Sequence, residues 1–343
     1  MPKSKLSPGE NFMRIVRGEI PDYVPIYTMG FPGLGGETAV KIIGPSLFDE
    51  THLKPAPTGR RDVWGVNYIA NEETNFACIP EPNNFLLDDI TKWRDVIKAP
   101  ELPANLDWER LAKADIADAE LDRSQSAAMA AIGLMPFQQL IAFMGFTGGL
   151  MAVAEEPEEV EALLHFMTDL YVPVVEKTVE YYAPDMLYLL DDTAAARFPF
   201  VSPDFFTNVL KPVYARLTKP AAERGIPVQL HNCGRCEDFL DDMYDVGTRV
   251  WDPAQLGNDI HAAKAKYKGK ISVAGAFSWT PHEDYTEEEV RAAVRACIDE
   301  YAPDGGFAFF GGILSRFGDR SLDNAVAWMN DEAYNYGRDY YLK

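Results

Sequence analysis

One short stretch, LHNCGRCEDFL at residues 230–240, brings a histidine and two cysteines together at the end of an apolar run. His231, Cys233 and Cys236 carry the nitrogen and sulfur atoms that zinc prefers, and three protein ligands with one open position are typical of a catalytic zinc site. On a strand His231 and Cys233 point to the same side, because successive side chains alternate. We therefore predict a zinc site at His231 and Cys233, with Cys236 as the candidate third ligand.

Two other interpretations of this stretch stay open. CGRC has the C-x-x-C spacing of a redox dithiol, and the histidine and cysteines could also be buried for structural reasons. The third ligand is open as well, because Asp191 or Asp192 could supply it from the end of the run DMLYLLDD. Only one of the two can face the site on a regular strand. A protonated Asp192 is also a candidate general acid.

Seven short apolar runs bounded by turn residues are expected to form buried strands. Helical patterns lie between them, most clearly at 156–182, 202–225 and 286–306, where Thr286 and Glu289 form a capping-box pattern. Alternation of strands and helices predicts parallel βαβ units. The expected strands are VPIYTMG (24–30), AAMAAIGLM (127–135), DMLYLLDD (185–192), IPVQLHNCG (226–234), TRVWDPA (248–254), ISVAGAF (271–277) and GFAFFGG (306–312).

This pattern favours an α/β fold, a (β/α)8 TIM barrel that occupies residues 1–343 as a single domain. An open doubly wound sheet is the alternative. Residues 31–125 fit the alternation less well, and we expect them to be an insertion after the first strand, with a hairpin formed by 64–70 and 75–80.

In such a barrel the carboxyl ends of the strands meet at one face, where the loops carry the chemistry. Aromatic and methionine side chains follow several of the expected strands, which predicts an apolar or aromatic substrate, although barrel packing would also explain any one of them. The candidate substrate-binding residues are Tyr27, Met29, Phe31, Tyr188, Phe277 and Trp279.

The net charge of −21 argues against nucleic acid and anionic membranes as partners. The 343 residues include four cysteines, which is too few for a disulfide framework. We find no apolar run of about 18 residues and no apolar segment typical of a secretory signal near the start. The expected location is therefore the cytoplasm, and a homo-oligomer is compatible with the composition.

Several of these segments resemble the uroporphyrinogen decarboxylase superfamily, and within it the corrinoid-linked methyltransferases. NFMRIVRGEIPDYVPIY is similar to the first helix and strand of that family, and the segment from VSPDFF to LHNCG is similar to its characteristic helix and His-x-Cys-Gly strand. The resemblance implies a (β/α)8 barrel. Decarboxylases of the superfamily carry Arg-Gln-Ala-Gly-Arg after the first strand, whereas this chain reads MGFPGLGGE. Porphyrinogen decarboxylation is therefore not expected.

Thiol-activating methyltransferases of the superfamily bind zinc through His-x-Cys and a distant cysteine near the last strand. His231 and Cys233 match the first two ligands, but FFGGILSR has Ile313 and Leu314 where the cysteine would be. The resemblance thus favours the arm that removes a methyl group from a small methoxylated aromatic or methylated amine and passes it to Co(I) of a separate corrinoid protein. DIHAAK (259–264) falls short of a corrinoid-binding signature, so the cobalamin is expected on that partner.

Three other functions remain as alternatives. The protein could accept methyl from a methyl-corrinoid and transfer it to a thiol or tetrahydrofolate. It could be a decarboxylase or lyase of another small acid. It could also be a non-catalytic binding barrel.

Overall fold

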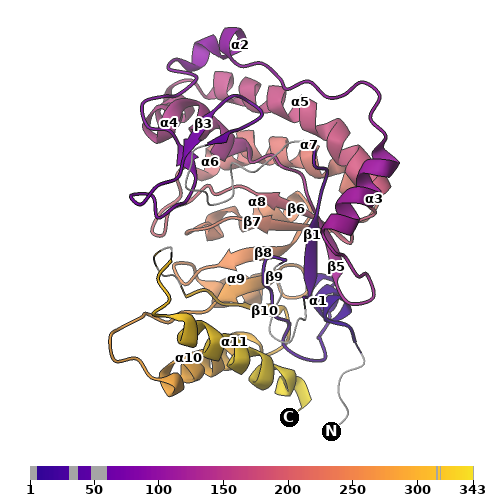
Figure 1. Cartoon of the computed structure of the whole chain (residues 1–343), viewed down its shortest axis with the longest axis vertical. Coiled ribbons are helices and arrows are strands. Elements are labelled where there is room, and N and C mark those ends of the chain that lie inside the picture. The colour runs from indigo at the N-terminus through magenta and orange to yellow at the C-terminus, as the bar shows by residue number, and fades with distance from the viewer. Residues whose placement is uncertain (1–5, 31–37, 48–59, 314–315, 317, 343) are drawn as a thin grey trace.

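The computed structural model describes residues 6–30, 38–47, 60–313, 316 and 318–342. Its central feature is a parallel sheet of seven strands that curls around an interior, with helices on its outer side (Figure 1). Each strand pairs with the next one along the chain, as expected for successive βαβ units. In sheet order the strands are β1 (Val40–Ile43), β5 (Ala127–Ala131), β6 (Met186–Leu190), β7 (Val228–His231), β8 (Thr248–Ala254), β9 (Ser272–Ala276) and β10 (Phe307–Phe310).

The segment before β1 occupies the eighth strand position in the wall of the barrel. Ile26 forms a parallel bridge with Phe309, and the amide of Tyr27 donates to the carbonyl of Phe309 at 2.8 Å. Further along this segment, Gly30 packs so tightly on Ile42 of β1 that an added Cβ would lie 3.1 Å from the Ile42 side chain. The segment therefore lies against β10 at one point and β1 at another, which confirms the predicted barrel architecture.

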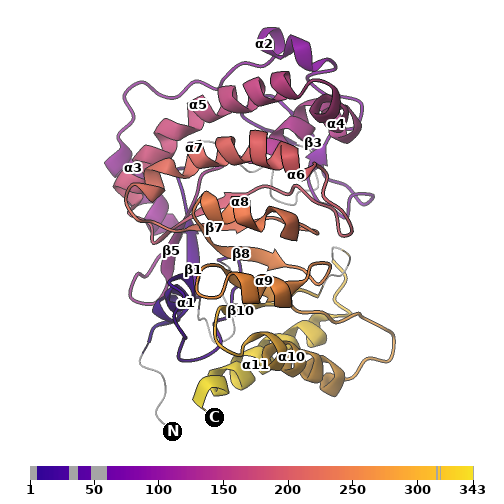
Figure 2. The ribbon, with the colours of Figure 1, turned by 180° about the vertical axis from the view of Figure 1, so that it is seen from behind.

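The range 31–125 contains both barrel and non-barrel elements. β1 lies inside it and joins the barrel sheet, which the sequence patterns did not reveal. A separate antiparallel sheet is formed by β2 (Arg60–Arg61), β3 (Asn67–Ile69) and β4 (Ile79–Pro80), and the pairing of β3 with β4 confirms the predicted hairpin. In both ribbon views β3 lies beside α4 (Figures 1 and 2).

Helices follow the strands and cover the outside of the barrel (Figure 2). Thr286 and Glu289 form the predicted capping box, and the Ser202 side chain accepts a hydrogen bond from the amide of Phe205 at 3.1 Å. The helices are α1 (Pro8–Val16), α2 (Trp93–Val96), α3 (Trp108–Asp118), α4 (Pro136–Glu155), α5 (Pro157–Tyr182), α6 (Pro203–Phe205), α7 (Lys211–Ala222), α8 (Leu240–Asp245), α9 (Ile260–Lys266), α10 (Glu287–Tyr301) and α11 (Asp323–Arg338). Short 3-10 or π turns occupy Ile90–Lys92, Phe206–Leu210, Glu237–Phe239 and Tyr340–Leu342.

Two hydrophobic cores follow from the alternation of side chains along the strands. The larger core lies between the sheet and the helices and includes Leu230 and Trp251. The smaller core fills the barrel interior, where Met129 and Val250 from the strands meet Phe12 from α1. This interior core packs the amino-terminal end of the barrel and leaves the carboxyl ends of the strands for the site.

Among the described residues, α4 is the one helix that is long and apolar enough, by length and composition alone, to cross a membrane. Half of its most apolar window is buried inside the protein, as in a core helix. The sequence had not indicated an apolar run of this length.

Candidate metal centre

The ends of β6 and β7 lie side by side and carry the candidate ligands. Leu190 and His231 are register partners, so the residues that follow them leave the sheet together. The amide of Asp191 donates to the carbonyl of His231 at 3.0 Å, and the side chain of Asn232 bonds to both the amide and the hydroxyl of Thr193. These bonds fix the two strand ends relative to each other.

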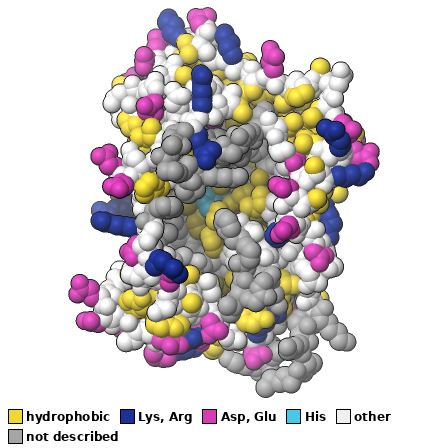
Figure 3. All heavy atoms as spheres, in the orientation of Figure 1, with side chains coloured by type: hydrophobic (Ala, Val, Ile, Leu, Met, Phe, Trp, Pro, Cys, Tyr) yellow, Lys and Arg dark blue, Asp and Glu magenta, His cyan; other side chains and the backbone are white. Residues whose placement is uncertain are grey.

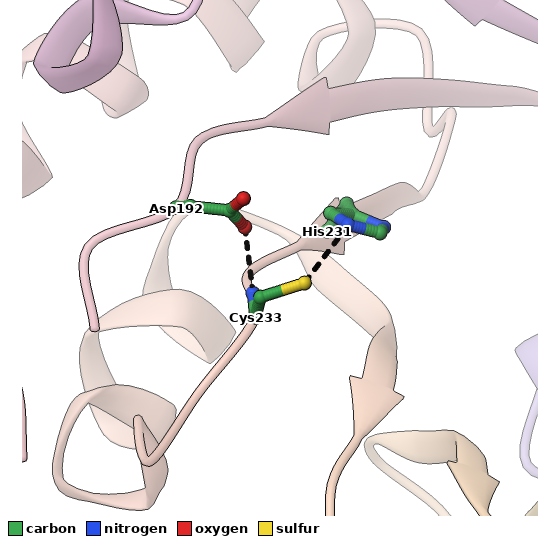
Figure 4. A group of neighbouring side chains, drawn as sticks. All are labelled: Asp192, His231 and Cys233. Carbon is green, nitrogen blue, oxygen red and sulfur yellow. Dashed lines mark hydrogen bonds between the residues drawn. The ribbon is translucent and has the colours of Figure 1, made fainter. Parts of the chain in front are cut away.

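Asp192, His231 and Cys233 converge at this point (Figure 4). Their potential ligand atoms all lie within 4.8 Å of one another. Nε2 of His231 lies 3.5 Å from Sγ of Cys233, and the amide of Cys233 donates to Oδ1 of Asp192 at 2.8 Å. Within the described parts of the chain, this is the one group of three or more His, Cys, Asp or Glu side chains close enough to share an ion.

The residues of this group fit a zinc ion. Tetrahedral zinc with bonds of about 2.1 Å to nitrogen and about 2.3 Å to sulfur places those two atoms about 3.6 Å apart. The observed separation of 3.5 Å between His231 and Cys233 agrees with that geometry. Three protein ligands would leave a fourth position for a substrate, as in catalytic zinc sites.

Asp252 contacts His231 on the side of the ring that faces away from Cys233. Its fully buried carboxylate lies 3.0 Å from Nδ1 of His231. Burial acts to lower the pKa of His231, but the hydrogen bonds to Asp252 and Cys233 outweigh it and raise that pKa to about 10. Because Nδ1 is held by Asp252, Nε2 is the ring atom that faces Cys233 and Asp192.

The two neighbouring aspartates have different environments. Asp191 points away from the group and accepts hydrogen bonds from the amides of Phe137 and Gln138 at the start of α4 and from the hydroxyl of Tyr214. Burial raises the pKa of Asp191 to about 7, against the opposing effect of these donors. Asp192 is therefore the member of the pair that reaches the site, a choice that the sequence left open.

Cys236 is not brought into the group. Its thiol is buried and donates to the carbonyl of Asn232 at 3.3 Å, and burial raises its pKa, which keeps it protonated. Cys233 and Cys236 do not form a disulfide here. The other two thiols are also outside the group: Cys297 lies in α10 and Cys78 near β4.

The loop that carries Cys233 is tightly framed. Gly234 has φ +88°, and an added Cβ would lie 2.5 Å from the carbonyl oxygen of Ala194, so a side chain would displace the loop. Its amide donates to Oε1 of Gln255, and its carbonyl accepts from Asn258. This framing fixes the direction of Cys233.

A cavity of about 420 Å³ opens beside the ligands. His231 and Cys233 line it together with Leu256, Phe277 and Phe310. On the face shown in Figure 3, a histidine and hydrophobic side chains lie at the base of a central hollow, in keeping with this cavity. Cys233 and Asp192 are half-buried, so a small molecule can reach them.

The other predicted substrate-binding residues have different positions. Tyr27 and Tyr188 are buried in the barrel interior, and Met29 packs against the same core. Trp279 packs on Tyr285, with ring centroids 5.4 Å apart. Phe31 lies outside the described residues.

Asp252 is the functional candidate that the sequence patterns missed. It lies in the run TRVWDPA, two residues beyond the inward-facing Val250, and is the register partner of His231. A charged residue on the inward side of the expected strand could have marked Asp252 as a site residue. Its pairing with His231, however, spans 21 residues and depends on the strand register.

Comparisons with known proteins agree with this fold. The family model described as uroporphyrinogen decarboxylase (URO-D) matches residues 77–312, more than half of the chain. A methyltransferase from Methanosarcina mazei has a similar structure, with a TM-score of 0.62, 16% sequence identity, and coverage of 99% of this chain and 100% of that chain. A sugar phosphate isomerase/epimerase from Parabacteroides distasonis also matches, with 11% identity and coverage of 90% and 99%, but its TM-score of 0.35 is too low to support the fold.

A search among curated proteins found no match. The likeness to the methyltransferase concerns the fold, because the identity is low. The family model, in contrast, spans β5 to β10 and so includes both strand ends that carry the candidate ligands. The chain therefore belongs to the uroporphyrinogen decarboxylase family.

Proposed function

We propose that this protein is a metal-dependent methyltransferase that removes a methyl group from a small methoxylated aromatic or methylated amine and transfers it to Co(I) of a separate corrinoid protein. The convergence of Asp192, His231 and Cys233 beside an open cavity carries this proposal. The fold that the chain shares with the methyltransferase from Methanosarcina mazei supports it.

The lining of the cavity argues against a porphyrinogen as the substrate. Its described lining residues include no Lys or Arg that could hold several carboxylates. Leu256, Phe277 and Phe310 instead offer apolar surface to a small ring or methyl group. This composition favours demethylation over the decarboxylation from which the family takes its name.

Each residue of the site has a defined part in the reaction. Asp192, His231 and Cys233 would hold a zinc ion. Zinc bound there would take up the negative charge that develops on the leaving oxygen of a methoxylated donor, or the lone pair that is freed on the leaving nitrogen of a methylated amine. Asp252 orients His231, and the framed loop orients Cys233. The apolar wall positions the donor and excludes water from its methyl group.

The corrinoid is proposed to arrive on a partner at the open end of the barrel. The DIHAAK segment lies in and just before α9, where His261 pairs with Glu300 of α10 at 2.9 Å, so its histidine is part of the barrel exterior. The absence of a disulfide between Cys233 and Cys236 also suits a reducing cytoplasm, where Cys233 stays available as a ligand.

Metal analysis and a methyl-transfer assay test this proposal. We expect one zinc per purified chain, loss of zinc in His231→Ala and Cys233→Ala, and retention in the control His261→Ala, which changes a histidine outside the site. We also expect wild-type protein to methylate free cob(I)alamin from a methoxybenzene or a methylated amine, followed by absorbance.

Three outcomes would change the assignment. Zinc-free protein with full activity would remove the metal from the mechanism. Transfer from methylcobalamin to a thiol or tetrahydrofolate, without transfer in the other direction, would replace the demethylase with the acceptor-side transferase. Failure with all methyl donors and acceptors would favour a lyase or a binding protein.

A further inference from the structure

A layer of polar side chains lies inside the barrel below the metal centre. Tyr27 and Tyr188 belong to the interior core, Gln229 is the register partner of Tyr188, and Asp252 is the register partner of His231. Within the described residues, the two tyrosine hydroxyls, both amide atoms of Gln229, and Oδ1 of Asp252 are buried without a hydrogen bond of ordinary geometry.

Packing alone does not account for this layer. Barrel interiors are usually filled by branched apolar side chains, as Val40 and Val250 do here. Each buried polar atom without a partner costs about 1–3 kcal/mol. A layer with several such atoms lowers stability, which points to a role in the site above it.

Asp252 is the charged member of the layer and depends on His231. Its carboxylate is fully buried, and His231 is its one ion-pair partner in the described structure. A buried carboxylate without a partner would be strongly unfavourable. The pair therefore constrains both members, because rotation of the His231 ring would leave the buried charge of Asp252 without its ion-pair partner.

Tyr27 and Tyr188 flank this carboxylate. Burial raises the pKa of both hydroxyls, and the negative charge of Asp252 raises them further, so both keep their protons. The rings are themselves held: Tyr27 packs edge-on against Phe310 at 5.1 Å, and Tyr188 packs edge-on against His231 at 6.3 Å between centroids. Two fixed hydroxyl groups thus lie near Asp252.

We propose that Asp252, flanked by Tyr27 and Tyr188, is the positioning residue of the metal centre: it holds Nδ1–H of His231 and so presents Nε2 to the ion shared with Cys233 and Asp192. This inference rests on the proposed metal centre. Asp252 touches neither the ion nor the substrate, and it acts through the orientation and basicity of the histidine.

Zinc affinity tests this role directly. Competition with a chromophoric chelator should show affinity about 10–100-fold below wild type for Asp252→Ala, since outer partners of ligating histidines have effects of that size. The zinc affinity of Asp252→Asn should lie between those of wild type and Asp252→Ala, because its amide oxygen can still accept from Nδ1–H of His231 but carries no charge. Tyr27→Phe and Tyr188→Phe should show smaller losses.

A second measurement reports on His231 itself. Nitrogen NMR of the zinc-loaded protein should show a histidine with metal on Nε2 and a proton on Nδ1, and Asp252→Asn should shift the Nδ1–H resonance. Asp62→Asn is the matched control: Asp62 is also buried and accepts from the amides of Trp64 and Val66, but in the small sheet. It should reduce stability and leave zinc affinity unchanged.

The outcomes separate the inference from the proposed function. Wild-type affinity in both Asp252 variants, with an unchanged His231 spectrum, would overturn the positioning role and leave the metal centre intact. Absence of zinc binding in the wild type would overturn both. If Asp252→Ala does not fold, the Asn variant and its NMR spectrum decide the question.

Discussion

Asp192 lies where a cysteine thiolate could complete a zinc site with His231 and Cys233. A carboxylate oxygen is a harder ligand than a thiolate, which leaves the bound ion more electrophilic. We expect Asp192→Ala to weaken cobalt(II) or zinc binding by at least about tenfold. Asp192→Cys, kept reduced, should restore binding and increase the sulfur-to-cobalt charge-transfer absorbance.

The control for this experiment is Cys236→Ala. That thiol bonds to Asn232 and is not among the grouped side chains, so its removal should leave both the metal content and the cobalt spectrum unchanged. Metal loss in Cys236→Ala, or full binding in Asp192→Ala, would show that the ion uses a different ligand set.

At the scale of residues, the sequence predicted His231 and Cys233 as a pair because side chains two positions apart on a strand point to the same side. The choice between Asp191 and Asp192 could not be predicted from the sequence. It depends on β6 ending at Leu190 and on the donors at the start of α4 that bind Asp191. The role of Asp252 could not be predicted from the sequence either, because it depends on strand register. These are contacts between elements, which local patterns do not encode.

At the scale of elements, Asp191 joins the end of β6 to the start of α4. Its removal in Asp191→Ala would leave the amides of Phe137 and Gln138 and the hydroxyl of Tyr214 without their partner. We expect the free energy of unfolding to fall by about 2–4 kcal/mol. Urea denaturation followed by circular dichroism measures this change.

Asp259→Ala provides the comparison for that variant. Asp259 also caps a helix, α9, through one bond to the amide of Ala262, but at an exposed position. Its loss should cost only about 1 kcal/mol. Equal effects of the two substitutions would contradict a special role for Asp191.

Lys264 of α9 gives the amino-terminal end of the barrel a pH dependence. It lines a cavity of about 760 Å³ and donates to the carbonyl of Gly305 at 2.7 Å. Burial lowers its pKa from 10.5 to about 8. Between these values the unfolded chain keeps a proton that the folded protein has released, so the free energy of unfolding should rise with pH.

Lys264→Met should remove that rise. Urea denaturation at pH 7 to 10 would show wild type gaining stability relative to the variant above about pH 8, with no such change below it. Lys268→Met, at an exposed neighbour paired with Asp304, should run parallel to wild type. If the free energies of unfolding of wild type and Lys264→Met differ by the same amount from pH 7 to 10, Lys264 is not the group that causes the rise.

Six of the seven predicted runs became sheet strands, because buried parallel strands have a strong signal of short apolar segments between turns. The first run instead forms an isolated bridge through Ile26, and the neighbouring position in the sheet is taken by β1. β1 is four residues long and includes Lys41, so neither its length nor its hydrophobicity marked it.

At the scale of the whole molecule, the two ends of the barrel are different. The amino-terminal end is packed by α1, while the carboxyl end has the candidate metal ligands, the 420 Å³ cavity and exposed aromatic side chains. Phe198, in the loop after β6, is 67% exposed, and Phe146 of α4 is 49% exposed. Aromatic side chains are enriched among the residues that dominate binding at protein interfaces, so these two are candidate anchors for a partner at this end.

A corrinoid protein of the kind proposed would have to cover this end to reach the candidate metal centre, so Phe198 is expected to contact it. Phe198→Ala should raise the KM for the corrinoid protein by about tenfold, the effect of losing roughly 1.4 kcal/mol at an anchor residue. Methylation of free cob(I)alamin should be unchanged, because Phe198 does not line the cavity. Ile20→Ala, which removes a 58% exposed side chain at the opposite end, should affect neither assay. Equal loss with free and protein-bound corrinoid would place Phe198 in the chemistry of the site instead of its docking surface.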